Sequence, residues 1–351
     1  MAMTTMKQIA KETGVSVSTV SLVLNGRDVG RIRPQIASLV RGTAKRLGYR
    51  PNPLASSLRT SRTRIIGFIS EEIATTPFAG GIILGAQDAA SMHDYVMLTV
   101  NTDGLSNETD EIAALQRYGV DGFIYAKMWN RMTEVPAGLQ DYPTVLVDAQ
   151  DLHGTVPSIT PNEFRIGHDA TTRLIDAGCT RIAYVGTDNV TMPAQIGRRA
   201  GYLQAIKDAN ITAHDDLDIA VGNNQSALDK VFALISTQHP DGVFCFNDAR
   251  TWHVYESAAR LGLSIGKDIR VVGVDNHRLV AETLAPQLTT IELPHYEMGY
   301  WGVCKLLSLI DPHTKPLIQP QDRATLPPLN GPVQSMIHCR LIEKDSVRAR
   351  S

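Results

Sequence analysis

Residues 49–60 read YRPNPLASSLRT, and the character of the chain changes on either side of this stretch. Pro51 and Pro53 disfavour helix just ahead of them, whereas Asn52 is a good N-cap and Pro53 a good first helical residue. The sequence therefore predicts a helix of about two turns at residues 53–60. Because so short a helix is unstable alone in water, we expect it to form only against a partner surface.

The 351 residues divide into a small basic head and a large acidic body. Residues 1–62 carry eleven lysines and arginines against Glu12 and Asp28, a formal net charge of +9, and the rest of the chain carries −11. A compact basic segment of this kind indicates a polyanionic partner. The composition, 43% hydrophobic and 20% charged, is typical of a globular protein, and the length predicts two or three domains.

The head has the pattern of a helix-turn-helix. Thr5 can cap a first helix that Gly14 ends, and Ser16 can cap a second helix, VSTVSLVLNG, whose apolar residues recur at helical spacing. A third helix is predicted over residues 34–47. In such a motif the N-terminal part of the second helix faces base edges in the major groove, where we expect Val17, Ser18, Ser21 and Leu22.

MKQIAKETGVSVSTVSLVLNG at residues 6–26 and LGYRPNPLASSLRTSRT at residues 47–63 together resemble the LacI/GalR family of bacterial transcription regulators. The resemblance implies that the short helices of two subunits pair as hinge helices in the minor groove, where a leucine of each wedges between base pairs. The matching residue is Leu58, beside Ala55; on spacing alone Leu58 could equally be a linker leucine packed on the body. The full set expected at double-stranded operator DNA is Thr5, Met6, Ser16, Val17, Ser18, Thr19, Ser21, Leu22, Asn25, Arg31, Asn52, Ala55 and Leu58.

The head departs from the family pattern at two places. Leu22 stands where the family often has an arginine that reads guanine, so we expect contact with a thymine methyl group or a packing role instead. The stretch GRDVGRIR at residues 26–33 is unusually rich in glycine and arginine. Arg31 and its neighbours could add phosphate contacts, which would raise affinity without adding sequence specificity.

Residues 63–351 alternate strand-like and helical stretches, which predicts parallel sheets with helices on both faces. The predicted strands are IIGFIS, YVMLTV, GFIYA, TVLVD, RIAYVG, GVFCF, IRVVGVD and LTTIEL. They are too many for one compact sheet, and the resemblance implies a two-lobed, periplasmic-binding-protein-like core for effector binding and dimerisation. Three crossovers are expected near residues 161–163, 291–294 and 319–323. Lobe 1 would then hold about residues 64–161 and 293–320, and lobe 2 about 162–291 and 321–340.

Polar side chains follow several predicted strands, at the edge where open α/β sheets bind ligands. Asp148 ends TVLVD, Asn247 and Asp248 follow GVFCF, and Asp275 ends VVGVD. Any one of these could merely cap the next helix, but together their oxygens suit sugar hydroxyls. By the resemblance, Arg198 matches the arginine that anchors the effector. The full effector-binding set expected is Thr76, Phe78, Asp148, Arg198, Asn224, Asn247, Asp248 and Asp275.

Other functional classes fit the sequence less well. It has no G-x-G-x-x-G, P-loop, H-E-x-x-H or G-x-S-x-G motif, so we do not expect an enzyme. Its cysteines lack metal spacing, and we expect neither a metal nor another cofactor. A solute-binding transport protein could share the body but would need a signal peptide, which the N-terminus does not resemble, and no apolar run reaches membrane length. We therefore expect a cytoplasmic protein without a membrane partner.

The mechanism expected is that of a homodimer on a pseudo-palindromic operator, controlled by a small effector. A sugar or sugar derivative is the first expectation for the effector, and a purine or nucleoside the second. An inducer and a co-repressor would need the same residues, so the sign of control stays open; repression of carbohydrate-utilisation genes relieved by a sugar is the default. The tail after Arg340 lacks a heptad repeat long enough for a coiled coil, which favours a dimer over a tethered tetramer.

Overall fold

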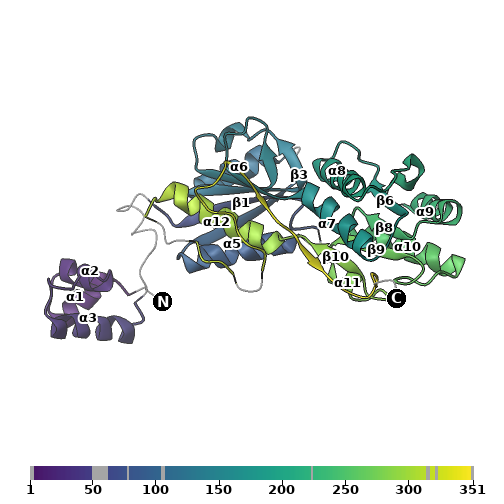
Figure 1. The fold of residues 1–351 in the computed structure, drawn as a ribbon. Helices are drawn as coiled ribbons and strands as arrows, with labels where there is room; N and C mark the ends of the chain where they lie inside the picture. Colours follow the sequence, from purple (N-terminus) through teal and green to yellow (C-terminus); the bar gives the residue numbers. More distant parts are fainter. Residues whose placement is uncertain are drawn as a thin grey trace. The chain divides into compact units, whose positions relative to one another are not determined.

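The computed structural model describes residues 4–49, 62–76, 79–103, 107–222, 224–313, 317–320 and 323–348. The chain divides into two compact units, a head unit (Met1–Thr63) and a core unit (Arg64–Ser351) (Figure 1). Within the described ranges no helix combines the length and the apolar character needed to cross a membrane.

The described part of the head unit contains α1 (Met6–Thr13), α2 (Val17–Leu24) and α3 (Pro34–Arg46). Thr5 caps α1 through reciprocal bonds with Gln8, and the Ser16 hydroxyl accepts from the Thr19 N–H at the start of α2. The apolar stripes of the three helices meet in one small core, and its fully buried members include Ile9, Val20, Val23 and Val40. The predicted helix-turn-helix head is confirmed.

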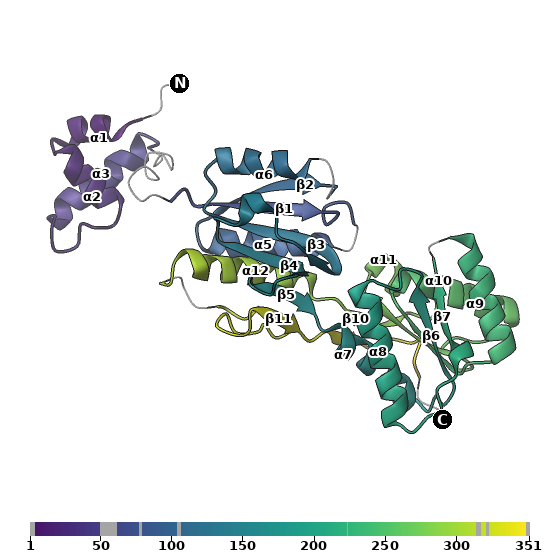
Figure 2. The same ribbon diagram turned by 90° about the horizontal axis from the view of Figure 1, so that it is seen from above.

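The first lobe of the core unit is a parallel six-stranded sheet in the order β11-β5-β4-β3-β1-β2. Its strands are β1 (Ile65–Glu71), β2 (Val96–Thr102), β3 (Gly122–Thr133), β4 (Thr144–Asp151), β5 (Ser158–Pro161) and β11 (Gln334–Ile337). Helices α5 (Gly80–Met92) and α12 (His295–Ile310) cover one face (Figure 2). The other face is covered by α6 (Glu108–Arg117) and the short helix η1 (Ala137–Leu139).

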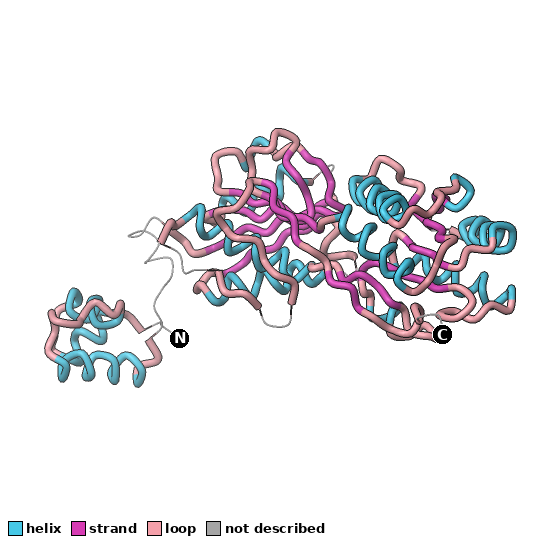
Figure 3. Tube along the Cα trace, viewed as in Figure 1, coloured by secondary structure: helices cyan, strands magenta, loops and turns pink. Residues whose placement is uncertain are grey.

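The second lobe repeats this architecture with the order β12-β10-β9-β8-β6-β7, in which β12 is antiparallel to β10. Figure 3 shows helices in cyan and strands in magenta in both lobes. Its strands are β6 (Ile182–Thr187), β7 (Asp218–Val221), β8 (Gly242–Cys245), β9 (Arg270–Asp275), β10 (Thr289–Glu292) and β12 (Arg340–Ile342). Its helices are α7 (Glu163–Asp176), α8 (Pro193–Asp208), η2 (Asp215–Leu217), α9 (Gln225–Gln238), α10 (Asp248–Leu261) and α11 (Arg278–Ala281). The α7–α8 pair packs on one face, and α9, α10 and α11 pack on the other. The α/β fold with two lobes is confirmed.

The chain crosses between the lobes from β5 to α7, from β10 to α12 and from β11 to β12. The third crossover therefore lies at residues 337–340, not near 319–323 as expected. Ala324 and Leu326 are buried in the first lobe's core, and the Trp301 indole N–H donates to the Pro327 carbonyl at 2.8 Å. The assignment of residues 323–337 to the second lobe is wrong because this proline-rich stretch ends in β11, which pairs with β5 in the first sheet.

Candidate functional site: a cavity between the lobes

A small cavity lies where the two lobes of the core unit meet. It encloses about 20 Å³, little more than the space of one water molecule. Four of the eight residues expected at the effector line it: Asp148, Arg198, Asn247 and Asp275. The other lining residues are Met128, Trp129, Pro161, Glu163, Phe246, Leu293 and His295.

Arg198 projects from α8 and is held on three sides. Its Nε donates to Glu163 Oε2 at 2.7 Å, and its Nη1 donates to the Phe246 carbonyl at 2.6 Å. Its guanidinium carbon lies 4.5 Å from the centroid of the Phe246 ring, in cation–π range. Burial lowers the pKa of Arg198, but the charges of Glu163 and Asp275 and the hydrogen bond to Glu163 together outweigh burial and raise the pKa above its ordinary value. The arginine is therefore a permanent, pre-oriented cation.

Glycines bring Glu163 and Arg198 together by letting α7 and α8 touch. A Cβ on Gly167 would lie 1.9 Å from the Arg198 carbonyl oxygen, and one on Gly201 would lie 2.0 Å from the Phe164 carbonyl oxygen. Both distances are far below contact, so the two helices pack backbone against backbone. Glu163, the first residue of α7, therefore reaches the side of α8 that carries Arg198.

Asp148 fixes the wall of the first lobe. Its two carboxylate oxygens accept from the N–H groups of Trp129 and Asn130, each at 3.0 Å. Those two residues have φ of 66° and 56°, and they sit where the pairing of β3 with β4 shifts register between Ala126 and Arg131. Burial, followed by the nearby charge of Glu163, raises the pKa of Asp148 to about 8. Asp148 thus stabilises the bulge that carries Trp129 into the cavity.

Asn247 and Asp275 line the cavity from the second lobe. Asn247 caps α10, and its Oδ1 accepts from the Arg250 N–H at 3.3 Å and from Arg250 Nη1 at 3.0 Å. Because that oxygen is occupied, the amide NH₂ is the part of Asn247 left for another partner. Asp275 ends β9, and burial together with the neighbouring Asp248 raises its pKa well above the ordinary value. An amide NH₂ group and a carboxyl group therefore both line the cavity from the second lobe.

Three other expected residues do not line the cavity. Asp248 is fully buried; it accepts from the Thr290 hydroxyl at 2.6 Å and from the His277 N–H at 2.8 Å, so it anchors the turn after β9. Asn224 is exposed at the start of α9 and accepts from the Ser226 hydroxyl at 2.6 Å. Thr76 lies in the turn after β1, where its N–H donates to the Glu72 carbonyl at 3.0 Å. Phe78 lies outside the described residues.

Sequence reasoning missed Glu163, Trp129 and Phe246 at the cavity, and Arg250 behind it. The Phe246 ring contacts two guanidinium groups, Arg198 at 4.5 Å and Arg250 at 5.2 Å. Arg250 also donates to the carbonyls of Gly186 and Val221, each at 3.2 Å. A signal for Phe246 was present, since it directly precedes Asn247 at a strand end; nothing in the local sequence distinguishes Trp129.

The head unit presents an uncharged surface on α2. Val17 is 42% exposed, Ser18 is exposed, and Ser21 and Leu22 are partly exposed. Arg31, also expected at the DNA, is exposed in the loop after α2.

Several other residues expected at the DNA stabilise helix ends, and one packs against the core. Thr5 and Ser16 cap helices through the bonds given above, Thr19 bonds the Ser16 hydroxyl at 2.9 Å, and Asn25 Nδ2 donates to the Ser21 carbonyl at 2.6 Å. Met6 packs against the head core. The remaining three, Asn52, Ala55 and Leu58, lie outside the described residues.

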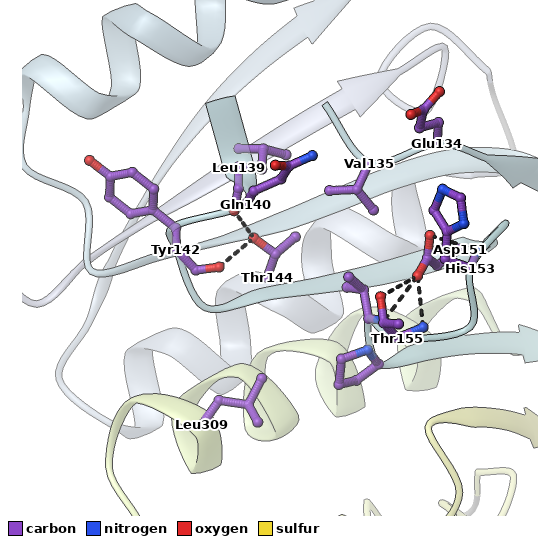
Figure 4. Close-up of a pocket in the computed structure, with 12 residues that line it drawn as sticks. Glu134, Val135, Leu139, Gln140, Tyr142, Thr144, Asp151, His153, Thr155 and Leu309 are labelled. Carbon is purple, nitrogen blue, oxygen red and sulfur yellow. Dashed lines mark hydrogen bonds between the residues drawn. The ribbon is translucent and has the colours of Figure 1, made fainter. Parts of the chain in front are cut away.

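A larger cavity of about 440 Å³ lies on the first lobe, bounded by residues 134–144, 151–157 and Leu309 (Figure 4). Its Asp151 carboxylate is occupied internally, because it accepts from the Thr155 N–H at 2.8 Å and from the Thr155 hydroxyl at 2.9 Å. None of the expected effector residues lines it. The described ranges also contain no cluster of three or more histidine, cysteine, aspartate or glutamate side chains suited to a metal ion.

Comparisons with known proteins bear on both units. Residues 5–52 match the family model "Bacterial regulatory proteins, lacI family", and residues 171–329 match "Periplasmic binding protein-like domain". The chain is 32% identical to the HTH-type transcriptional regulator RegA of Clostridium saccharobutylicum over 88% of this chain and 93% of RegA. It is 31% identical to the ribose operon repressor of Escherichia coli K12 over 93% and 98% of the two chains. The lac repressor dimer bound to operator and an anti-inducer shares the fold, with a TM-score of 0.76, 19% identity and coverage of 99% and 100%.

Proposed function

Because the chain belongs to the lacI family of DNA-binding bacterial transcription regulators, which are not enzymes, we propose that it represses carbohydrate-utilisation genes under the control of a sugar-like effector. The regulator class follows from the family. The identity of the effector, the sign of control and the dimeric assembly are proposals.

The observation that carries the sugar assignment is the chemistry of the cavity between the lobes. Arg198, Asn247 and Asp275 stand beside the Phe246 ring. Hydroxyl groups can donate to carboxylates and accept from guanidinium and amide N–H groups, while the apolar face of a sugar ring packs on an aromatic side chain. The name of the relative from E. coli, a ribose operon repressor, is consistent with this class.

Binding of a sugar requires the lobes to move. A cavity of about 20 Å³ is too small for a monosaccharide, so the lobes must open about the three crossovers to admit it. A change in the angle between the lobes is the kind of displacement that can alter the spacing of two heads on DNA. The effector and the operator would then be coupled reciprocally, each changing the affinity for the other.

We infer that the working form is a homodimer that reads a pseudo-palindrome in the cytoplasm, where the operator DNA is. Leu84 and Met92 on α5 and Val96 at the start of β2 are large apolar side chains exposed on the first lobe. Such exposure is consistent with a surface covered by a second subunit. Sedimentation equilibrium at micromolar concentration tests this: a dimer mass is expected, and a monomer would contradict it.

The effector class is tested by thermal unfolding of the full chain with a panel of neutral pentoses, neutral hexoses, purine bases and nucleosides. A neutral sugar should raise the Tm, and by more the tighter it binds at a given concentration. Arg198→Ala should abolish that shift, whereas Arg199→Ala should preserve it, because Arg199 is an exposed neighbour on α8 that pairs with Asp218. A purine that raises the Tm while no sugar does would replace the sugar assignment.

A further inference from the structure

The loop between α2 and α3 carries an acid among arginines. Residues 26–33 read GRDVGRIR, in which Asp28 is one of two acids in residues 1–62. Arg27 and Arg31 are exposed, whereas Asp28 is 6% exposed. On charge alone, an acid at this place would weaken the attraction of the head to phosphate groups.

Asp28 is bound to α3 by an ion pair that spans the head. Arg41 Nη2 lies 2.7 Å from both carboxylate oxygens of Asp28. The Asp28 carbonyl in turn accepts from the N–H groups of Arg31 at 3.0 Å and Ile32 at 2.9 Å, and Ile32 packs against the head core. Asp28 therefore closes the turn of the loop through its carbonyl group and binds the loop to α3 through its side chain.

The second acid of the head makes a different kind of pair. Glu12 on α1 binds Arg46 on α3, and both side chains are largely exposed. An ion pair that is exposed at both partners contributes little. In the Asp28–Arg41 pair the Asp28 side chain is 8% exposed and the Arg41 side chain 53%, so the pair holds a buried carboxylate to α3. The Glu12–Arg46 pair also lies outside the α2–α3 loop. It therefore provides a matched control with the same charges.

We propose that the Asp28–Arg41 pair is a positioning brace for DNA binding. It holds the loop so that Arg27 and Arg31 reach the phosphates beside the half-site, and Arg41 is used in the brace instead of binding DNA. The family's DNA binding is the premise of this proposal, which is independent of the effector and its cavity.

The direction in which one substitution changes DNA affinity tests the brace. Asp28→Asn removes a negative charge from a DNA-binding surface, so charge alone predicts tighter binding. The brace predicts binding that is about five- to tenfold weaker, because an arginine of the loop no longer bonds to its phosphate. The slope of log affinity against log salt should also fall by about one for each phosphate that the head no longer neutralises. Glu12→Gln makes the same charge change and should bind at least as tightly as the wild type.

The assay uses the full chain and a duplex enriched from a random library by the wild type, with fluorescence anisotropy at several salt concentrations. Binding of Asp28→Asn as tight as or tighter than that of the wild type would overturn the brace. In a double-mutant cycle, Asp28→Asn with Arg41→Gln should bind no more weakly than the weaker single variant. Additive losses would show that Arg41 contacts DNA independently and would overturn its assigned role.

Limited proteolysis of the head reports whether each variant folds. If Asp28→Asn is unfolded, the double variant Asp28→Asn with Arg41→Gln removes both charges together and leaves the net charge unchanged. That variant is compared with Glu12→Gln with Arg46→Gln, which has the same net charge. Weaker operator binding by the Asp28/Arg41 double variant alone supports the brace, and equal binding by the two double variants contradicts it.

Discussion

Two buried carboxyl groups, Asp148 at the inter-lobe cavity and Asp248 outside it, sit in surroundings that oppose their charge. Asp148 is 3% exposed, and burial raises its pKa to about 8, while the pKa of Asp248 beneath the β9 turn is raised to about 7. Both groups are anchored by hydrogen bonds from the backbone or a hydroxyl group. Asp148 therefore anchors the bulge at the cavity wall, and Asp248 anchors the turn after β9, although burial raises the pKa of both groups.

The raised pKa of Asp148 predicts a dependence of stability on pH. The native state keeps a proton that the unfolded chain releases near pH 4, so this stabilisation is lost as the pH rises through about 8. The free energy of unfolding of the core should fall by about 2 kcal/mol between pH 6 and 9 from this group. Urea unfolding of Asp148→Asn should show a shallower fall, and Asp141→Asn, an exposed control in the same lobe, should match the wild type. Equal slopes for all three proteins would rule the assignment out.

Leu22 gives a second prediction for a single side chain. It is partly exposed on α2, a helix with no charged residue, so this position lacks the donors that read guanine. Leu22→Arg should move the preferred half-site towards guanine at one position, with about 1–3 kcal/mol of new discrimination. Selection from a random duplex library with both proteins measures the change. An unaltered site would remove residue 22 from the base-reading surface.

Pairs of secondary-structure elements set the geometry of both lobes through glycines. In the first lobe a Cβ on Gly85 would lie 1.9 Å from the Tyr296 carbonyl oxygen, and one on Gly299 would lie 1.9 Å from the Ile82 carbonyl oxygen. The α5–α12 pair therefore packs as closely as the α7–α8 pair of the second lobe. In both pairs, contact between helix backbones leaves no space for even a methyl group.

Gly167→Ala tests this packing. The added methyl group meets the Arg198 backbone, which cannot move aside as a flexible side chain would, so the core should lose about 1–3 kcal/mol of stability. Any ligand that needs Arg198 should also bind more weakly. Gly80→Ala is the control, because a Cβ there meets nothing within 4 Å. Urea unfolding that gives the two variants the same stability would contradict backbone-to-backbone packing.

Among the described strands, the sequence predicted every strand of six or more residues, but only β8 and β10 among the shorter ones. All eight predicted strands are present, and for most of them the signal is that buried parallel strands appear as nearly unbroken apolar runs. It missed β5, β7, β11 and β12, which have only three or four residues each. The last two strands decide where the third crossover lies, so that boundary was misplaced. Such short strands are specified by their partners across the sheet, which a local pattern does not reveal.

The candidate site was predictable to a similar extent. Strand ends identified Asp148, Asn247 and Asp275, because polar residues after apolar runs gather at one edge of a parallel sheet. The same rule placed Asp248 at the cavity, but its carboxylate is turned inward to Thr290 and the His277 N–H. Which of two adjacent polar residues faces a cavity depends on tertiary hydrogen bonds. Glu163 was missed for the same reason, since its role depends on the contact between α7 and α8.

The whole molecule combines two functions whose residues do not overlap. The head unit contains the residues that match the lacI family model, and the core unit carries the cavity between two lobes joined by three crossovers. Coupling between them requires a ligand that binds two arrangements of the lobes with different affinity. Operator affinity should therefore depend on effector concentration.

The most direct test of this coupling is to measure operator affinity with and without the ligand that thermal unfolding identifies. Both measurements use the same near-physiological salt concentration. We predict that selection yields a two-fold-symmetric site and that ligand changes wild-type affinity for it by at least about fivefold. Arg198→Ala should bind the same site with an affinity that the ligand does not alter. A ligand that binds the wild type without changing its affinity for the operator, or changes it equally in Arg198→Ala, would contradict the account.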